Sequence, residues 1–212
     1  RSSAASDVHK RQKLSSVEDI KTAVASNPRI GQILYEAGVP LVINYQNLST
    51  IKEGHLNDTV EYSKALAKKL GLSPEEVKTV EVAAAFHDIG KSLIPAEYLN
   101  KNGALSKDER KVVNLHAVLG YELMKSLGYK PEIAEAVRDH HNPNSKNELA
   151  QILRMADIYS AMTEERPYKP ARSHYDAMRV LRDCKLPDNL IKLGNVLKDA
   201  HDDLHAPVQQ RA

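Results

Sequence analysis

The chain contains no tryptophan, a single phenylalanine and a single cysteine among its 212 residues. Aromatic residues make up 5% of the sequence, which argues against the aromatic stacking platforms that bind single-stranded nucleic acid. Because Cys184 has no second cysteine to pair with, an intrachain disulfide is excluded and a reducing, cytoplasmic location is expected. No apolar run approaches the ~20 residues of a membrane span, so we expect no membrane insertion.

A large excess of charge of either sign is also missing. The net charge is +2, so no strong field attracts the chain to a nucleic acid polymer or to an anionic membrane. Hydrophobic residues make up 42% and charged residues 27%, as in globular proteins. The length allows one domain with a sizeable core and a small helical extension. The chain begins at Arg1 and not at Met, which leaves room for an upstream regulatory domain.

Helical periodicity dominates what is present. Ser73 before Pro74, and Ser106 three residues before Glu109, are typical helix starts. Leu41–Tyr45 is the one strand candidate and it is isolated, so the predicted fold class is all-α. Residues 92–105 are predicted to form a connection. Helices are predicted over approximately 16–24, 29–36, 50–70, 74–88, 107–127, 131–141, 147–163, 173–183 and 187–203.

These helices predict the domain organisation. Residues 1–13 are polar and aperiodic, as in a disordered tail or linker. Residues 14–48 are expected to form an N-terminal helical extension, residues 49–205 the main domain, and residues 206–212 a flexible tail. Exposed helices at either end are suited to forming a homodimer.

The strongest chemical feature is the segment Phe86–Lys91, which contains adjacent histidine and aspartate residues. It follows an apolar helical stretch, so His87 and Asp88 are expected at the end of a buried helix. Further along the chain, His116 lies at helical spacing from Leu119 and therefore points inward.

Other histidines and aspartates could also bind a metal, but each of them, taken singly, has an explanation that involves no metal. His55 suits a surface or capping position, and His116 suits a hydrogen-bonded core position. Asp157 suits a buried ion pair. The pair His140-His141 suits a helix C-terminus, where cations interact favourably with the helix dipole.

Together these residues favour a metal centre over incidental packing. Their number exceeds what one tetrahedral zinc needs. It suits two metals ~3.5–4 Å apart that share a carboxylate, and Asp88 is the natural bridge. Such a centre acidifies a water and neutralises phosphate charge, which indicates hydrolysis of a phosphate ester. The predicted metal ligands are His55, His87, Asp88, His116, His140, His141 and Asp157.

Three basic residues are candidates for substrate contact. Lys91 follows Asp88 by three residues and is predicted to act on a phosphate oxygen or to donate a proton; its alternative is an exposed loop position. Arg166 and Lys169 flank a proline-stiffened segment suited to gripping phosphate, and the alternative is a solvated linker.

These residues resemble the HD-GYP branch of the HD superfamily of metal-dependent phosphohydrolases. The resemblance covers about residues 50–180. It implies an all-α, five-helix HD core with added helices and two divalent metals, commonly iron or manganese. It also implies hydrolysis of cyclic di-GMP to linear pGpG or GMP. The residues that carry it are His55, His87-Asp88-Ile89-Gly90-Lys91, Ile94-Pro95, Leu99-Asn100-Lys101, Leu105, His116, Gly120, His140-His141, Ala156-Asp157-Ile158-Tyr159 and Arg166-Pro167-Tyr168-Lys169.

The resemblance also implies roles for individual residues. One metal would be held by His55, His87, Asp88 and Asp157, and the other by Asp88, His116, His140 and His141. Lys91 resembles the family's active-site lysine, and Arg166 and Lys169 match its phosphate-contacting motif. Because Ile51 stands where three-metal members place a glutamate, two metals are expected.

The chain departs from the family pattern at several positions. Residues 142–147 form a short loop without the Gly-Tyr-Pro triplet that names the family. Ser160 stands where the family often has a second aspartate, and Ala117 replaces a common proline. The leading hypothesis is a phosphodiesterase for a cyclic dinucleotide. The alternatives are a catalytically weak metal- and nucleotide-binding receptor, or a phosphohydrolase for another nucleotide or phosphoester.

Overall fold

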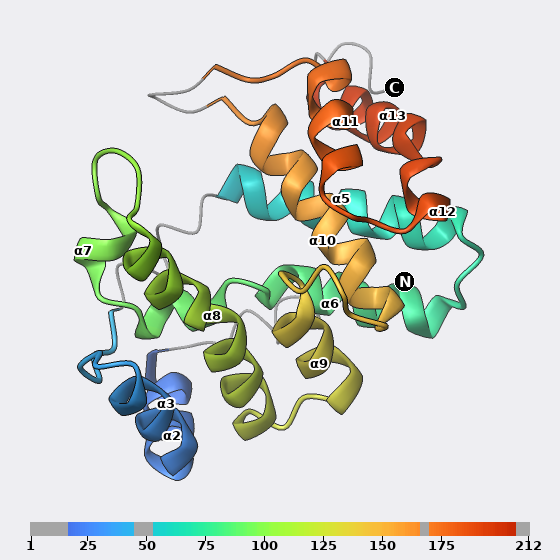
Figure 1. The fold of residues 1–212 in the computed structure, drawn as a ribbon. Helices are drawn as coiled ribbons and strands as arrows, with labels where there is room; N and C mark the ends of the chain where they lie inside the picture. The colour runs from blue at the N-terminus through green and yellow to red at the C-terminus, as the bar shows by residue number, and fades with distance from the viewer. Residues whose placement is uncertain (1–16, 45–52, 166–169, 207–212) are drawn as a thin grey trace. The chain divides into compact units, whose positions relative to one another are not determined.

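The computed structural model describes residues 17–44, 53–165 and 170–206, and every regular element in these ranges is a helix (Figure 1). The chain divides into two compact units. Unit 1 comprises Arg1–Thr50 and Asp88–Ala134, and unit 2 comprises Ile51–His87 and Glu135–Ala212. The predicted all-α fold class is confirmed.

Unit 1 is organised around a long helix, α8. The helix begins after Ser106, which forms the predicted capping box with Glu109. The shorter helices of the unit pack against α8. Asn27 caps the start of α3, and its Nδ2 donates to Glu122 Oε2 on α8 over 3.1 Å. The helices of this unit are α2 (Val17–Ser26), α3 (Pro28–Glu36), the 3-10 helix η1 (Ile89–Leu93), α7 (Ala96–Leu99) and α8 (Lys107–Ser126).

Unit 2 is built around α5, which contacts α6, α10 and α13. At its centre the rings of Tyr62 and Tyr159 pack edge to face, with centroids 5.2 Å apart. Buried aliphatic side chains surround this pair, including Leu66, Met155 and Leu181. The helices of this unit are α5 (Glu53–Lys69), α6 (Pro74–Phe86), α10 (Glu148–Thr163), α11 (His174–Asp183), α12 (Asp188–Ile191) and α13 (Gly194–His205), and α9 (Pro131–Asp139) contains the boundary between the units.

The structure corrects two predictions of local structure. The helix predicted over 187–203 is interrupted, because α12 ends at Ile191 and α13 begins at Gly194. Gly194 is buried against α11, and a Cβ at this position would lie 2.5 Å from Met178 Cε. The connection predicted over 92–105 contains the end of η1 and the short helix α7. The strand candidate is not a strand over residues 41–44, the part of it that the structure describes.

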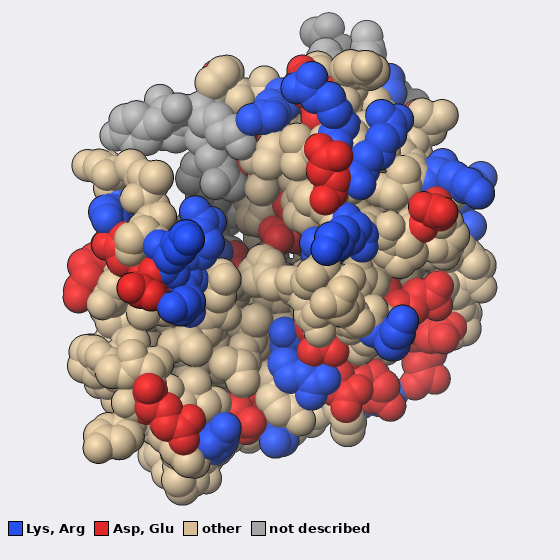
Figure 2. Space-filling model, in the orientation of Figure 1, with Lys and Arg blue, Asp and Glu red and all other residues tan. Residues whose placement is uncertain are grey.

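Some predictions fall on residues outside the described ranges. They include the tail over 1–13, most of the tail over 206–212, and the substrate contacts Arg166 and Lys169. The division into a 14–48 extension and a 49–205 main domain stays a prediction. Among the described helices, none combines the length and apolar character needed to cross a bilayer. On the face drawn in Figure 2, basic and acidic side chains of the described residues are interspersed, as expected for a net charge of +2.

Candidate metal centre

The His87-Asp88 pair lies at a helix junction. Helix α6 starts with a capping box between Ser73 and Glu76 and ends at Phe86, so His87 is its C-cap. Asp88 occupies the N-cap position of η1, and its side chain makes no capping hydrogen bond there. Both side chains are buried. A buried imidazole beside a buried carboxylate is costly unless hydrogen bonds or a cation compensate for the lost water.

In unit 2, three predicted ligands meet where α5, α6 and α10 pack together. The Nε2 atom of His55 lies 3.2 Å from Oδ1 of Asp157. The Nε2 atom of His87 lies 3.7 Å from the same oxygen. The ring of His140 is next to that of His87, with centroids 5.3 Å apart. Two imidazoles therefore converge on one carboxylate oxygen, and a third lies beside them.

The backbone sets the tautomer of two of these histidines. Nδ1 of His87 lies 2.7 Å from the carbonyl oxygen of Ala84, and Nδ1 of His140 lies 2.6 Å from that of Val137. A carbonyl oxygen can only accept a hydrogen bond, so Nδ1 carries the hydrogen in both rings. The lone pair is consequently on Nε2, the usual arrangement of a histidine that binds a metal.

A serine has the same effect on His55. Oγ of Ser160 donates to the backbone carbonyl oxygen of His55 over 3.2 Å. The serine Oγ also lies 2.8 Å from Nδ1 of the His55 ring and accepts a hydrogen bond from it. This bond places the lone pair of His55 on Nε2, the atom that faces Asp157.

In unit 1, Asp88 lies between His116 and Lys91. Nδ1 of His116 is 2.6 Å from the carbonyl oxygen of Val113, and Nε2 is 3.4 Å from Oδ1 of Asp88. Lys91 Nζ donates to Oδ2 of Asp88 over 2.6 Å. The Lys91 side chain is therefore paired with Asp88, and its role towards a substrate stays a prediction.

The close approach of η1 to α8 requires a glycine. A Cβ at Gly90 would collide with the backbone carbonyl oxygen of His116 and would lie 2.6 Å from the Gly120 nitrogen. The absence of that atom lets η1 lie directly on α8 at the turn that carries His116. Gly90 thereby determines the spacing between Asp88 and His116.

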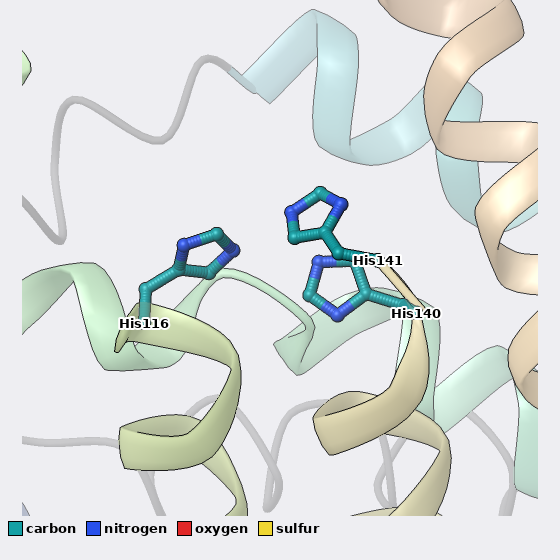
Figure 3. Close-up of side chains that lie close together, drawn as sticks. All are labelled: His116, His140 and His141. Carbon is teal, nitrogen blue, oxygen red and sulfur yellow. The ribbon is translucent and has the colours of Figure 1, made fainter. Parts of the chain in front are cut away.

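The adjacent histidines at the end of α9 differ in exposure. His140 is buried and His141 is exposed. Figure 3 shows both side chains projecting from this helix end, and their ring centroids are 3.9 Å apart. The same figure shows His116 projecting from α8. The predicted inward orientation of His116 is confirmed by its burial.

The donor chemistry fits a divalent cation. A lone-pair nitrogen and a carboxylate oxygen repel each other unless a proton or a cation lies between them. Two ligands of one ion, each about 2.1 Å from it, lie about 3.0–3.5 Å apart. The distances from Asp157 to His55 and from Asp88 to His116, 3.2 and 3.4 Å, fall in this range. Imidazole with carboxylate suits zinc, manganese, iron and similar ions.

Asp157 is held in the form that binds a cation. Burial alone would raise the pKa of its carboxyl group. When a proton and not a cation lies between His55 Nε2 and this carboxylate, the resulting hydrogen bond, together with positive charge at His87 and His140, outweighs burial and holds the pKa of Asp157 below its ordinary value. The ionised carboxylate is therefore the favoured state.

The structure gathers the predicted ligands in two groups. His55, His87, His140, His141 and Asp157 belong to unit 2. Asp88 and His116, with Lys91, belong to unit 1. Metal binding by each residue stays a prediction.

Sequence reasoning did not assign the role of Ser160 as the partner of His55. The spacing in the sequence could have indicated this role, because Ser160 follows Asp157 by three residues on α10 and therefore lies on the same helix face. Its role depends on α5 packing against α10, which the sequence alone does not reveal.

Comparisons with known proteins agree with this chemistry. A family model described as "HD domain" matches residues 53–162. Among solved structures, the HD domain of the Listeria monocytogenes phosphodiesterase PgpH, in complex with cyclic-di-AMP, superposes with a TM-score of 0.57 at 15% identity. The match covers 85% of this chain and 98% of that domain. At this identity the likeness establishes the fold.

Curated relatives are similar to part of the chain. The cyclic di-GMP phosphodiesterase response regulator RpfG of Xanthomonas campestris is 35% identical in an alignment 122 residues long, and the match covers 50% of this chain and 32% of RpfG. The 3'3'-cGAMP-specific phosphodiesterase 1 of Vibrio cholerae is 28% identical over 60% of this chain and 32% of its own length. A cyclic di-GMP phosphodiesterase of Thermotoga maritima is 28% identical over 66% of this chain and 41% of its own length. The chain spans about a third of the length of the first two relatives.

Proposed function

The chain belongs to the HD domain family, as its motifs predicted, and from this premise we propose that it is a metal-dependent phosphodiesterase acting on a cyclic dinucleotide. The observation that carries the proposal is the set of histidines whose Nδ1 atoms are held and whose Nε2 atoms face carboxylate oxygens. Such a donor set suits divalent metals, which this reaction class uses to activate water and to stabilise phosphate charge.

Two divalent metals, iron or manganese, are part of the proposal. One would be held by His55, His87, Asp88 and Asp157 and the other by Asp88, His116, His140 and His141. Asp88 is suited to serve both because it is joined to His87 by a peptide bond and approaches His116 through its Oδ1 atom. When bound, the metals supply Lewis acidity to the phosphate and acidify a water.

The remaining residues would orient the ligands and the substrate. Ser160 holds the imidazole of His55, and Lys91 holds one oxygen of Asp88. The Lys91 ammonium is also suited to contact a non-bridging phosphate oxygen, because a partly exposed cation beside the carboxylate is accessible to an anion. The proposed contacts of Arg166 and Lys169 with substrate phosphate rest on the sequence motif.

The substrate is proposed to be cyclic di-GMP, with linear pGpG or GMP as product. The names of relatives such as RpfG and the Thermotoga maritima enzyme support this choice. The 3'3'-cGAMP-specific relative makes that cyclic dinucleotide the next candidate. A cytoplasmic location, where such messengers are found, stays a prediction, as do a homodimer and an upstream regulatory domain.

A receptor with little turnover is the second candidate, and the loop after His141 favours it. The loop lacks the Gly-Tyr-Pro triplet and is tied to α10, because Gln151 Nε2 donates to the carbonyl oxygens of Asn142 and Ser145, each over 3.1 Å. A short, anchored loop changes the surroundings of the substrate without altering any proposed ligand. A phosphohydrolase for another nucleotide or phosphoester is the third candidate.

Product analysis separates these functions. Anaerobically purified protein, loaded with iron or with manganese, is incubated with cyclic di-GMP, 3'3'-cGAMP and pGpG, and the products are resolved by chromatography. We expect metal-dependent formation of pGpG or GMP by the unchanged protein. His87→Ala and Asp88→Asn should abolish it, whereas Asp108→Asn, at an exposed position, should not.

The outcomes distinguish the candidates. Retained turnover in both ligand variants would overturn the proposed centre. Tight nucleotide binding without product over hours would instead establish the receptor, and a faster reaction with another phosphoester would establish the third candidate.

A further inference from the structure

A second group of ligand-type side chains lies in unit 2, apart from the residues assigned above. It consists of Asp58 on α5 with His201 and His205 on α13. Each offers one ligand atom, and these atoms all lie within 4.8 Å of one another. The two histidines are spaced i, i+4, which puts both on one helix face, as in helical motifs that bind zinc.

A buried tyrosine orients one of these histidines. The hydroxyl of Tyr62 lies 2.6 Å from Nδ1 of His201. Because Tyr62 is fully buried, its pKa is raised, and the phenol stays neutral. The phenolic oxygen can accept a hydrogen bond from Nδ1–H, and in that tautomer the lone pair of the His201 ring is on Nε2. A partner that fixes one ring nitrogen is the usual support of a histidine that binds a metal through the other.

Two further features suit a cation. Asp58 is only 6% exposed, and a carboxylate so buried needs a positive partner. Its Oδ2 lies 3.1 Å from Nε2 of His205, and either a proton or a metal ion has to lie between these two atoms.

The group is open on one side. The His205 side chain is 50% exposed, so its ring is accessible from solvent and a water can complete the coordination. The next acidic residue, Asp202, is engaged elsewhere, because its Oδ2 accepts from Lys198 Nζ over 2.6 Å. The cluster is therefore a specific set of two imidazoles and one carboxylate.

We propose that Asp58, His201 and His205 bind one divalent transition-metal ion of the zinc type, separate from the phosphohydrolase ligands. Two imidazoles, a carboxylate and a water form a common tetrahedral set for zinc. The ion would link α13 to α5, because it would be coordinated by residues of both helices. Asp58 follows His55 by three residues on α5, so this link would also stabilise the position of the helix that carries His55. This inference does not depend on the proposed phosphodiesterase activity.

The test compares zinc binding by the full chain and by two variants. His205→Ala removes an accessible ligand near a helix end, and Asp58→Asn keeps the shape of the side chain but removes its charge. Zinc bound per chain is measured by elemental analysis after equilibrium dialysis. We expect each variant to bind about one equivalent less than the unchanged protein. Asp202→Asn, the matched control on α13, should bind as much as the unchanged protein.

Hydrogen exchange localises the effect. In the unchanged protein, zinc at 100 times its Kd should slow exchange through α13 (Gly194–His205) by up to about 100-fold, and in His205→Ala it should not. Equal zinc content in the unchanged protein and both variants, or equal protection of α13, would overturn the proposal. In that case Asp58 and His205 form an ion pair only. If His205→Ala loses helical content, Asp58→Asn decides the question.

Discussion

Ser160 on α10 supports the imidazole of His55 on α5 through a 2.8 Å hydrogen bond between the serine oxygen and Nδ1. The two residues are 105 positions apart in the chain. The serine stands where the resembled family often has an aspartate, so the chain uses a neutral acceptor to orient this imidazole. A neutral partner still places the lone pair of the imidazole on Nε2.

Replacing this serine should weaken metal binding. Ser160→Ala removes the acceptor of the Nδ1 hydrogen, so the His55 ring is free to rotate and to change tautomer. We expect metal affinity to fall about 10–100-fold, with helical content preserved. Competition with a chelator of known affinity measures this change. The matched control is Ser126→Ala, which removes a hydroxyl that donates to the carbonyl oxygen of Glu122; an equal loss in that variant would argue against the orienting role.

Adding one methyl group at Gly90 should loosen the contact between η1 and α8. Its Cβ would collide with the His116 carbonyl oxygen, and backbone cannot yield as a flexible side chain can. We expect Gly90→Ala to reduce the free energy of unfolding by about 1–3 kcal/mol, measured by urea denaturation. Gly31→Ala on α3, where a Cβ meets nothing within 4 Å, should instead stabilise by about 0.5–1 kcal/mol. Similar behaviour of the two variants would contradict the close-approach argument.

Lys91 should affect turnover more than metal content. Under the proposed function, Lys91→Gln removes a cation that contacts Asp88 and is placed to contact phosphate. We expect kcat to fall about 10²–10³-fold, with the bound metal unchanged within error. Product assays and elemental analysis on one preparation measure both quantities. Lys111→Gln, at an exposed lysine of α8, is the control and should retain full turnover.

The tyrosine pair at the centre of unit 2 should make the fold sensitive to alkali. Burial, with a further contribution from Asp202, raises the pKa of Tyr159 to about 12 from an ordinary value of 10.0. The folded state therefore keeps the phenolic proton after the unfolded chain has lost it. This contribution to stability is fully present below pH 10 and is lost as the pH rises toward 12.

Denaturant unfolding between pH 9 and about 12 measures this loss. Tyr159→Phe should show a shallower decline than the unchanged protein, because the buried phenol no longer titrates on unfolding. Tyr35→Phe, which alters a tyrosine that is 86% exposed, controls for the removal of a hydroxyl group. Identical pH profiles for all three proteins would argue against a contribution from Tyr159.

The helices and the ligand types were predictable because they depend on local chemistry. The capping boxes at Ser73 and Ser106 and the inward orientation of His116 follow from spacing along single helices. The break before Gly194 was not predictable, because periodicity continues across it and the close approach of Met178 comes from another helix. Likewise, η1 and α7 are too short to produce a periodic signal.

What the amino-acid sequence determined by itself was the all-α fold and the inventory of candidate metal-ligating side chains, since helix periodicity and ligand chemistry are properties of short segments. The tertiary structure alone decided how those side chains are held. Ser160 reaches His55, and Asp58 meets His201 and His205, only because α10 and α13 both pack on α5. Hydrogen bonds between residues far apart in the chain depend on packing distances of a few ångströms, which spacing along the chain does not specify.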